Sequence, residues 1–212
     1  MVDAELRAFV PIDRMQPQYA AYWGLTGRGS MPTSGMSQLL VEVRPGNVVY
    51  GLMDAVLKAV DVRSCGHLVE RDFGLMEMHA RSPDAIAQAG EVVLAELGCR
   101  MTDRLAPRLA SEQLLTNVTD YHSQLLNRVR RGDWILPAGS VYIAEVTPAA
   151  YVNLVGNEIE KALDIDLVRM AGAGVFGRLL VGGSETEVQS AAEVTRQVIA
   201  STAERSHEPA GV

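Results

Sequence analysis

The chain has 212 residues, with 19 basic and 26 acidic side chains and a formal net charge of -7. This length can bury one large core or two cores of about 100 residues each. The negative charge disfavours nucleic acid and anionic membrane surfaces as partners. The first residues carry no basic leader, and no apolar run approaches the roughly 20 residues that span a bilayer. We therefore expect a cytoplasmic protein that binds neither nucleic acid nor membrane.

Apolar periodicity predicts two similar series of elements separated by a polar segment. The first series is predicted to contain, in chain order, a helix at 16–24, a strand at 37–43, a helix at 47–60, strands at 65–70 and 73–80, and a helix from about 83 to 97. The segment 98–111 is polar and contains proline, which is typical of a linker. The second series is predicted to contain a helix at 120–129, a strand at 140–146, a helix at 150–163, a strand at 176–183 and a helix from about 185 to 200.

The two series are an internal repeat, because a shift of 103 residues brings them into register. The shift lays residues 41–62 over residues 144–165, and the identical pairs include Glu42 with Glu145, Pro45 with Pro148, Lys58 with Lys161, and Asp61 with Asp164. We therefore expect two similar mixed α/β domains, at 1–100 and 111–205. The remaining residues are expected to form a linker at 101–110 and a disordered tail at 206–212.

Gly172, Gly174 and Gly177 have the G-x-G-x-x-G spacing of a dinucleotide-binding turn. That turn requires a helix immediately after the glycines, because the pyrophosphate binds at the helix N-terminus. The sequence after Gly177 is instead a strand-like run that ends in glycines. We therefore expect a loop between two strands and no nucleotide cofactor.

Other catalytic or metal-binding patterns are absent. The four histidines, at 67, 79, 122 and 207, have no H-x-x-x-H or H-x-H spacing, and neither cysteine lies near them in a metal-binding motif. Cys65 and Cys99 are expected to be small buried hydrophobes. Glu70, Asp72 and Glu77 could supply paired carboxylates, but three acids around a hairpin are more often a solvated edge. We expect no catalytic residue, no metal and no cofactor.

The pattern D-A-x-x-K-A, followed by V-E-R and then F-G-x-L, resembles the tandem-domain shell proteins of bacterial microcompartments. The resemblance covers nearly the whole chain and includes MDAVLKAVDV (53–62), NEIEKALDI (157–165) and FGRLLVGGSETEVQSAAE (176–193). The helical stretch before each repeat is similar to the circularly permuted, gated-pore subgroup, which includes a carboxysome shell protein. The implied fold is α/β of the α+β sandwich type, with two tandem, circularly permuted shell domains. Three chains would form a pseudohexameric trimer.

The resemblance also implies roles for individual residues. Glu70 and Arg71 match the acid and arginine of the subgroup's pore gate, while Gly172, Ala173 and Gly174 match the pore loop of the second domain. Lys58 and Lys161, the only two lysines among 19 basic residues, match the residues at the edge where neighbouring units meet. The implied partners are other hexameric and pentameric shell proteins and small metabolites that cross the pore. In the subgroup, two trimers can stack face to face.

Several alternatives remain open from the residues alone. Glu70 and Arg71 could form an ordinary exposed ion pair, and the two lysines could be solvated residues that duplication made equivalent. The whole chain could be a small-molecule binding or sensing module with a duplicated fold, or an enzyme with a site between subunits. Carbon dioxide fixation and the diol, ethanolamine and amino-alcohol pathways all remain open for the encapsulated metabolism.

Overall fold

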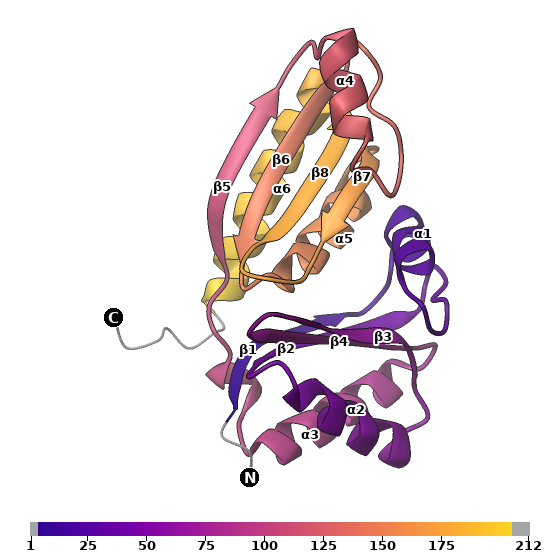
Figure 1. Ribbon diagram of the computed structural model, residues 1–212, viewed down its shortest axis with the longest axis vertical. Helices are drawn as coiled ribbons and strands as arrows, with labels where there is room; N and C mark the ends of the chain where they lie inside the picture. The colour runs from indigo at the N-terminus through magenta and orange to yellow at the C-terminus, as the bar shows by residue number, and fades with distance from the viewer. Residues whose placement is uncertain (1–3, 205–212) are drawn as a thin grey trace.

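Each half of the chain forms a four-stranded antiparallel sheet with two helices on one face and a further helix at its side (Figure 1). The computed structural model describes residues 4–204. The first domain contains β1 (Glu5–Ile12), α1 (Pro17–Thr26), β2 (Ser37–Arg44), α2 (Val48–Ala59), β3 (Arg63–Glu70), β4 (Phe73–Ala80) and α3 (Pro83–Leu97). Its strand order is β1-β2-β4-β3.

The second domain repeats this build. After a short 3-10 turn (Met101–Asp103), it contains β5 (Arg108–Leu115), α4 (Asp120–Asn127), β6 (Ser140–Thr147), α5 (Tyr151–Ala162), β7 (Asp166–Ala171), β8 (Gly177–Gly183) and α6 (Glu185–Ala203). The strand order, β5-β6-β8-β7, is equivalent to that of the first sheet. The first residues of β1 and β5, α1 and α4, β2 and β6, α2 and α5, and β3 and β7 all differ by 103, so the predicted repeat is confirmed.

The helix that closes each repeat has clear sequence signals at its ends. Ser82 caps the N-terminus of α3 and Pro83 occupies its first position, while Gly98 ends it in the left-handed conformation with φ of 65°. Ser184 and Glu187 form a reciprocal capping box at the start of α6. These signals explain why the predicted starts of both helices agree with the structure.

The first strand of each domain was not predicted. β1 begins at Glu5, and β5 begins at Arg108, so residues 108–110 of the expected linker belong to a strand. β5 is largely exposed in the single chain, which gives it a polar sequence without clear alternation. The expected tail at 206–212 lies outside the described residues. No helix in the described part of the chain is long and apolar enough to cross a membrane.

One hydrophobic cluster spans the two domains, and the first domain also has a cluster of its own. The inner face of the first sheet packs on α2 and α3, whereas its outer face, including Val10 and Leu40, joins the core that α5 and α6 form with the second sheet. Helix α5 consequently lies between the two sheets (Figure 1). The outer face of the second sheet has only a small apolar cluster, around Val141 and Leu180, and is otherwise open. The outer face of the first sheet is therefore covered within the chain, and the outer face of the second sheet is not.

Candidate functional site

The two predicted pore segments lie side by side. Glu70 ends β3, and Arg71 and Asp72 form the tight turn into β4. The β7–β8 loop approaches this turn from the second domain (Figure 1), and a Cβ atom at Gly174 would lie 3.5 Å from Cγ of Glu70. The structure therefore brings together the proposed gate residues of one domain and the proposed pore loop of the other, although 100 residues separate them in sequence.

The side chains of Glu70 and Arg71 are exposed at the tip of this turn. Within the described part of the chain, neither forms an ion pair, so the alternative of a simple Glu70–Arg71 pair is not what the single chain shows. Arg71 adopts a left-handed backbone conformation with φ of 54°, which is uncommon outside glycine, asparagine and aspartate. The turn thus presents two exposed charged side chains that have no ion-pair partner in the described part of the chain.

The glycines of the β7–β8 loop serve two purposes. Gly172 packs directly against the side-chain amide of the buried Asn153, where a Cβ would collide. Gly174 has φ of 102°, a conformation that favours glycine. Gly172 is therefore held by close packing against Asn153. The predicted loop between two strands is confirmed, since β8 and not a helix begins at Gly177.

The two lysines occupy equivalent places near the ends of α2 and α5. Lys58 Nζ lies 2.6 Å from a carboxylate oxygen of Asp54, and Lys161 Nζ lies 3.1 Å from one of Glu158. Their side chains are 74% and 61% exposed. Exposed pairs of this kind contribute little to the stability of a single chain. Both ammonium groups are therefore available for contacts outside it.

A cleft of about 550 Å³ runs between β3 and β7, from α1 to the pore segments. Glu70 and Gly174 line it near the pore segments, and Trp23 of α1, Cys65 and Glu77 also line it. The two domains together form this cleft, which connects a buried polar cluster with the proposed gate.

That polar cluster consists of Cys65 on β3 and Glu77 and His79 on β4. Each of the three is at most 2% exposed, and their thiol, carboxylate and imidazole ligand atoms lie within 4.8 Å of one another. The antiparallel register of β3 and β4 places Gly66 opposite Glu77, so Cys65 meets residues 12 and 14 positions away. The linear spacing of histidines and cysteines hides this proximity, which is why the sequence indicated no metal-type cluster. The predicted burial of Cys65 is confirmed, whereas Cys99 is only partly buried.

Hydrogen bonds hold the cluster in one arrangement. The Glu77 carboxylate accepts from the backbone N–H of Cys65 at 2.7 Å and from the amide of Gln38 at 2.9 Å, and lies 2.9 Å from His79 Nδ1. Tyr19 in turn donates its hydroxyl to the Gln38 oxygen at 2.6 Å. Burial, reinforced by the charge of Glu77, raises the pKa of the Cys65 thiol to about 12. The thiol is therefore protonated at neutral pH in the isolated chain.

A second set of polar contacts joins the domains. Glu42, 1% exposed on the outer face of the first sheet, accepts from Arg7 Nε at 2.8 Å and from the backbone N–H of Ala150 at 2.8 Å. Burial raises the pKa of Glu42, while both hydrogen bonds oppose the increase. Asn157 of α5 accepts from the backbone N–H of Gln16 at 2.9 Å. These contacts satisfy backbone donors at the starts of α5 and α1.

Comparison with known sequences identifies similar proteins along the whole chain. The family model for the N-terminal domain of CsoS1D matches residues 6–103. The carboxysome shell protein CcmP of Synechococcus elongatus is 37% identical over 203 residues, which cover 96% of this chain and 95% of CcmP. The carboxysome shell protein CsoS1D of Hydrogenovibrio crunogenus is 38% identical over 196 residues, 92% of this chain and 96% of that protein.

Two solved structures are similar over nearly their full length. The fused permuted hexameric shell protein MSM0275 of the RMM microcompartment has a TM-score of 0.90 and 34% identity, covering 93% of this chain and 98% of that one. The double-ringed trimeric shell protein MSM0271 of the same microcompartment has the same TM-score and identity, covering 97% of this chain and 100% of that one.

Proposed function

We propose a ring assembly for this chain, which belongs to the tandem-domain shell proteins of bacterial microcompartments and is a structural shell subunit. In this assembly, three chains form a homotrimer of six domains, with a gated pore at the centre and contacts to other shell proteins at the edge. The interface between the two domains of one chain carries the proposal, because the internal repeat presents the same surfaces again for a second chain.

The contact of Glu42 with Ala150 is the first interdomain contact that the repeat can form again between two chains. Counted by the 103-residue shift, the equivalent of Glu42 is Glu145, and the equivalent of Ala150 is Asn47 at the start of α2. Glu145 lies on the open outer face of the second sheet and pairs there with Arg178, which takes the place of Arg7. In the trimer, Glu145 of one chain accepts a hydrogen bond from the Asn47 N–H of the next.

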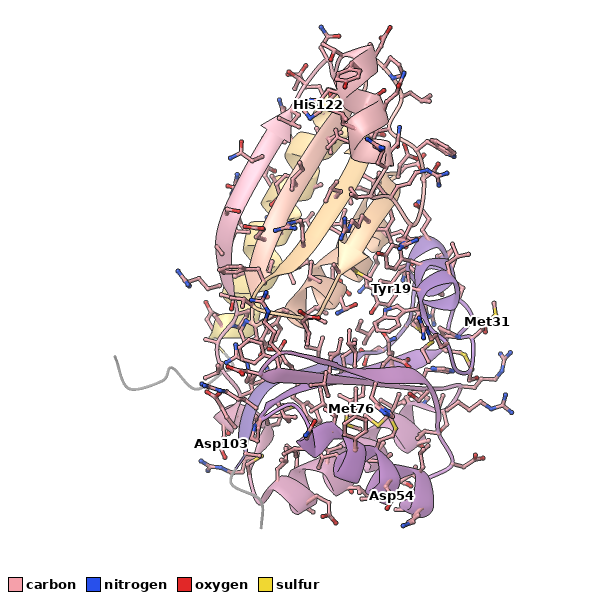
Figure 2. The ribbon with its side chains drawn as sticks, in the orientation of Figure 1. Tyr19, Met31, Asp54, Met76, Asp103 and His122 are labelled. Atoms are coloured by element: carbon pink, nitrogen blue, oxygen red, sulfur yellow. The ribbon has the colours of Figure 1, made fainter. Side chains whose placement is uncertain are left out.

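The contact of Asn157 with Gln16 is the second interdomain contact that the repeat can form again between two chains. Its equivalents are Asp54 on α2 and the backbone N–H of Thr119, which caps α4. Asp54 and His122, a residue of α4, lie at opposite ends of the molecule (Figure 2). The two equivalent surfaces therefore cannot meet within one chain but can meet head to tail between chains, which is the arrangement that closes into rings.

The side chains that differ between the two interfaces also favour contact between chains. Within the chain, Glu160 accepts from the backbone N–H of Gln18 at 2.6 Å. The equivalents of these two residues are Leu57 and Tyr121, which are 51% and 72% exposed. Tyr50, a further apolar residue of α2, is 51% exposed. Large exposed apolar residues at matched positions are typical of surfaces that a partner covers.

The pore follows from the same geometry. A ring of three chains repeats the pairing of Glu70 and Arg71 with Gly172, Ala173 and Gly174 three times around the axis. An arginine can bind a neighbouring carboxylate bidentately and close the opening, or turn away and leave it wide. We assign the gate to the first domain, because Gly172, Ala173 and Gly174 of the second-domain loop have almost no side chain. Small metabolites are the cargo that such a gate would admit.

At the rim, Lys58 and Lys161 make the contacts with other hexameric and pentameric shell proteins in a microcompartment shell. Their long aliphatic stems can pack flat while the ammonium groups reach polar atoms of the neighbour. We also propose that two trimers stack face to face, as the description of MSM0271 as double-ringed indicates for that protein. The relatives are structural proteins, and we assign this chain no catalytic role.

The 550 Å³ cleft favours a second candidate, a small-molecule binding or sensing module. The mass of the purified protein by light scattering, followed by electron microscopy at high concentration, separates the two. Three or six chains per particle, together with extended layers, are expected for the shell subunit. A stable monomer that binds ligand without forming layers would overturn the ring and make the binding module the better explanation.

A further inference from the structure

The internal repeat provides two copies of one position in the fold, under α1 in the first domain and under α4 in the second. In the second domain this position is an apolar cluster that contains Val141, Val168 and Leu180. The 103-residue shift places Gln38, Cys65 and Glu77 there in the first domain. The fold is therefore compatible with an apolar set at this position and does not require the polar one.

We propose that Cys65, Glu77 and His79 form a binding site for a divalent transition-metal ion of the zinc class, open to the cleft between β3 and β7. Thiolate sulfur, imidazole nitrogen and carboxylate oxygen are the three protein ligand types that zinc takes. The combination disfavours magnesium and calcium, which prefer oxygen ligands. This site does not depend on the shell assembly, because all three residues belong to one hairpin of one chain.

The distances suit an ion with little rearrangement. Neighbouring ligands of a tetrahedral zinc ion lie about 3.5 Å apart, given bonds of about 2.0–2.3 Å. The three ligand atoms already lie within 4.8 Å of one another. Side-chain rotations that move each atom by about 1 Å would therefore bring them to bonding distance of a common centre.

The surroundings of the three residues also match those of known metal sites. Gln38 donates to the Glu77 carboxylate, and Ser30 contacts both other residues, with its carbonyl oxygen 3.0 Å from Cys65 Sγ and its hydroxyl 3.4 Å from His79 Nε2. Such outer hydrogen bonds orient metal ligands and tune their affinity. Cys65 and Glu77 line the cleft while His79 does not, so the ion has an entry path and a fourth position that water or a small ligand can occupy.

Cobalt and zinc titrations of the full-length, chelator-treated protein test the proposal. We expect one Co²⁺ per chain, with a thiolate-to-cobalt absorption band in the near ultraviolet that one equivalent of Zn²⁺ abolishes. Cys65→Val introduces the residue that the second repeat carries at this position, so it should keep the fold while removing the band and weakening zinc binding by at least about 100-fold. Cys65→Ser provides a second, smaller change at the same atom.

Two control variants distinguish this site from adventitious binding. Cys99→Ser removes the other cysteine, and His67→Ala removes the exposed histidine of the same hairpin. Both should retain the stoichiometry and the absorption band. The proposal is overturned if wild-type protein binds no stoichiometric metal, if the band survives in folded Cys65→Val or Cys65→Ser protein, or if Cys99→Ser alone removes it. Light scattering of the same samples reports the trimer separately, so loss of the metal site and loss of the assembly are distinguishable.

Discussion

Glu70 and Arg71 are exposed charged residues with no ion-pair partner in the described part of their own chain. If they gate a pore, replacing both by alanine should leave the trimer intact, because neither side chain contributes to the core. The closed pore should disappear, since Gly172, Ala173 and Gly174 of the second-domain loop have no long side chain to fill it. Cryo-electron microscopy of the double variant checks this expectation.

Asp72→Ala, on the same turn, is the control and should retain closed particles. A closed pore in the Glu70→Ala/Arg71→Ala protein would show that other residues make the gate.

At the level of single residues, sequence reasoning succeeded where position in a motif was sufficient. The equivalence of Lys58 and Lys161 follows from the repeat, and both are exposed as an edge role requires. The Cys65 cluster could not be found in the same way, because its members meet only through the register of β3 and β4. An alternating pattern of Glu77 and His79 on a predicted hairpin opposite Cys65 was the available signal. Its use required a strand register that the sequence alone does not define.

At the level of secondary-structure elements, Glu145 tests whether the interdomain contact is repeated between chains. Glu145→Ala should leave the folded chain almost unchanged, because exposed ion pairs such as Glu145–Arg178 contribute at most about 1 kcal/mol. It should weaken each contact between chains by about 1–3 kcal/mol, or about 10–100-fold in affinity, since the α2 N–H of the next chain loses its acceptor. Analytical ultracentrifugation measures both the trimer and its dissociation.

Glu112→Ala is the matched control for this change, because Glu112 also pairs with an arginine, Arg196, and is also partly exposed. Its partner lies on α6 of the same chain, so trimer affinity should not change. Equal weakening by Glu112→Ala and Glu145→Ala, or no weakening by either, would contradict the repeated interface.

The pH dependence of the stability of the folded chain involves the same carboxylate. Hydrogen bonds from Arg178 and Ser111 lower the pKa of Glu145 below its usual value. For an acid with a lowered pKa in the folded state, the stabilising contribution is present above the ordinary pKa of about 4.3 and is lost as the pH falls through the lowered value. This contribution to the free energy of unfolding of the chain should therefore be retained above about pH 4.3 and decline as the pH falls further. In Glu145→Gln protein the loss of stability on acidification should be smaller, as thermal unfolding followed by circular dichroism across the range would show.

Sequence reasoning missed β5, whose surroundings the single chain does not supply, and β1, which is covered within the chain. Helices α2 and α5 pack against their own sheets, so their apolar spacing predicted them well. β5 presents residues such as Ser111 and Gln113 on a face that is open in one chain, and its pattern resembles a linker. β1 has an apolar run from Ala8 to Val10, but Pro11 within the strand and Pro17 after it obscured the pattern. A strand on an uncovered face is difficult to recognise from one sequence, because burial and not intrinsic preference produces the strand pattern.

At the level of the whole molecule, Lys58 and Lys161 test whether the trimer tiles into a layer. In the wild-type chain, Lys58 pairs with Asp54 and Lys161 pairs with Glu158. Changing both lysines to glutamate places two negative charges beside these carboxylates. Because both side chains are exposed, the fold of the chain should keep its stability to within about 1 kcal/mol. Asp54, beside Lys58, also belongs to the proposed contact between chains, so light scattering checks that the variant is still a trimer before layers are scored. The contact with neighbouring units should fail through like-charge repulsion, so electron microscopy should show dispersed trimers in place of layers. Arg81→Glu, at the exposed turn before α3, is the control charge reversal and should still form layers. Layers of normal spacing from the Lys58→Glu/Lys161→Glu protein would show that the paired lysines are a product of duplication alone and that another surface joins the shell.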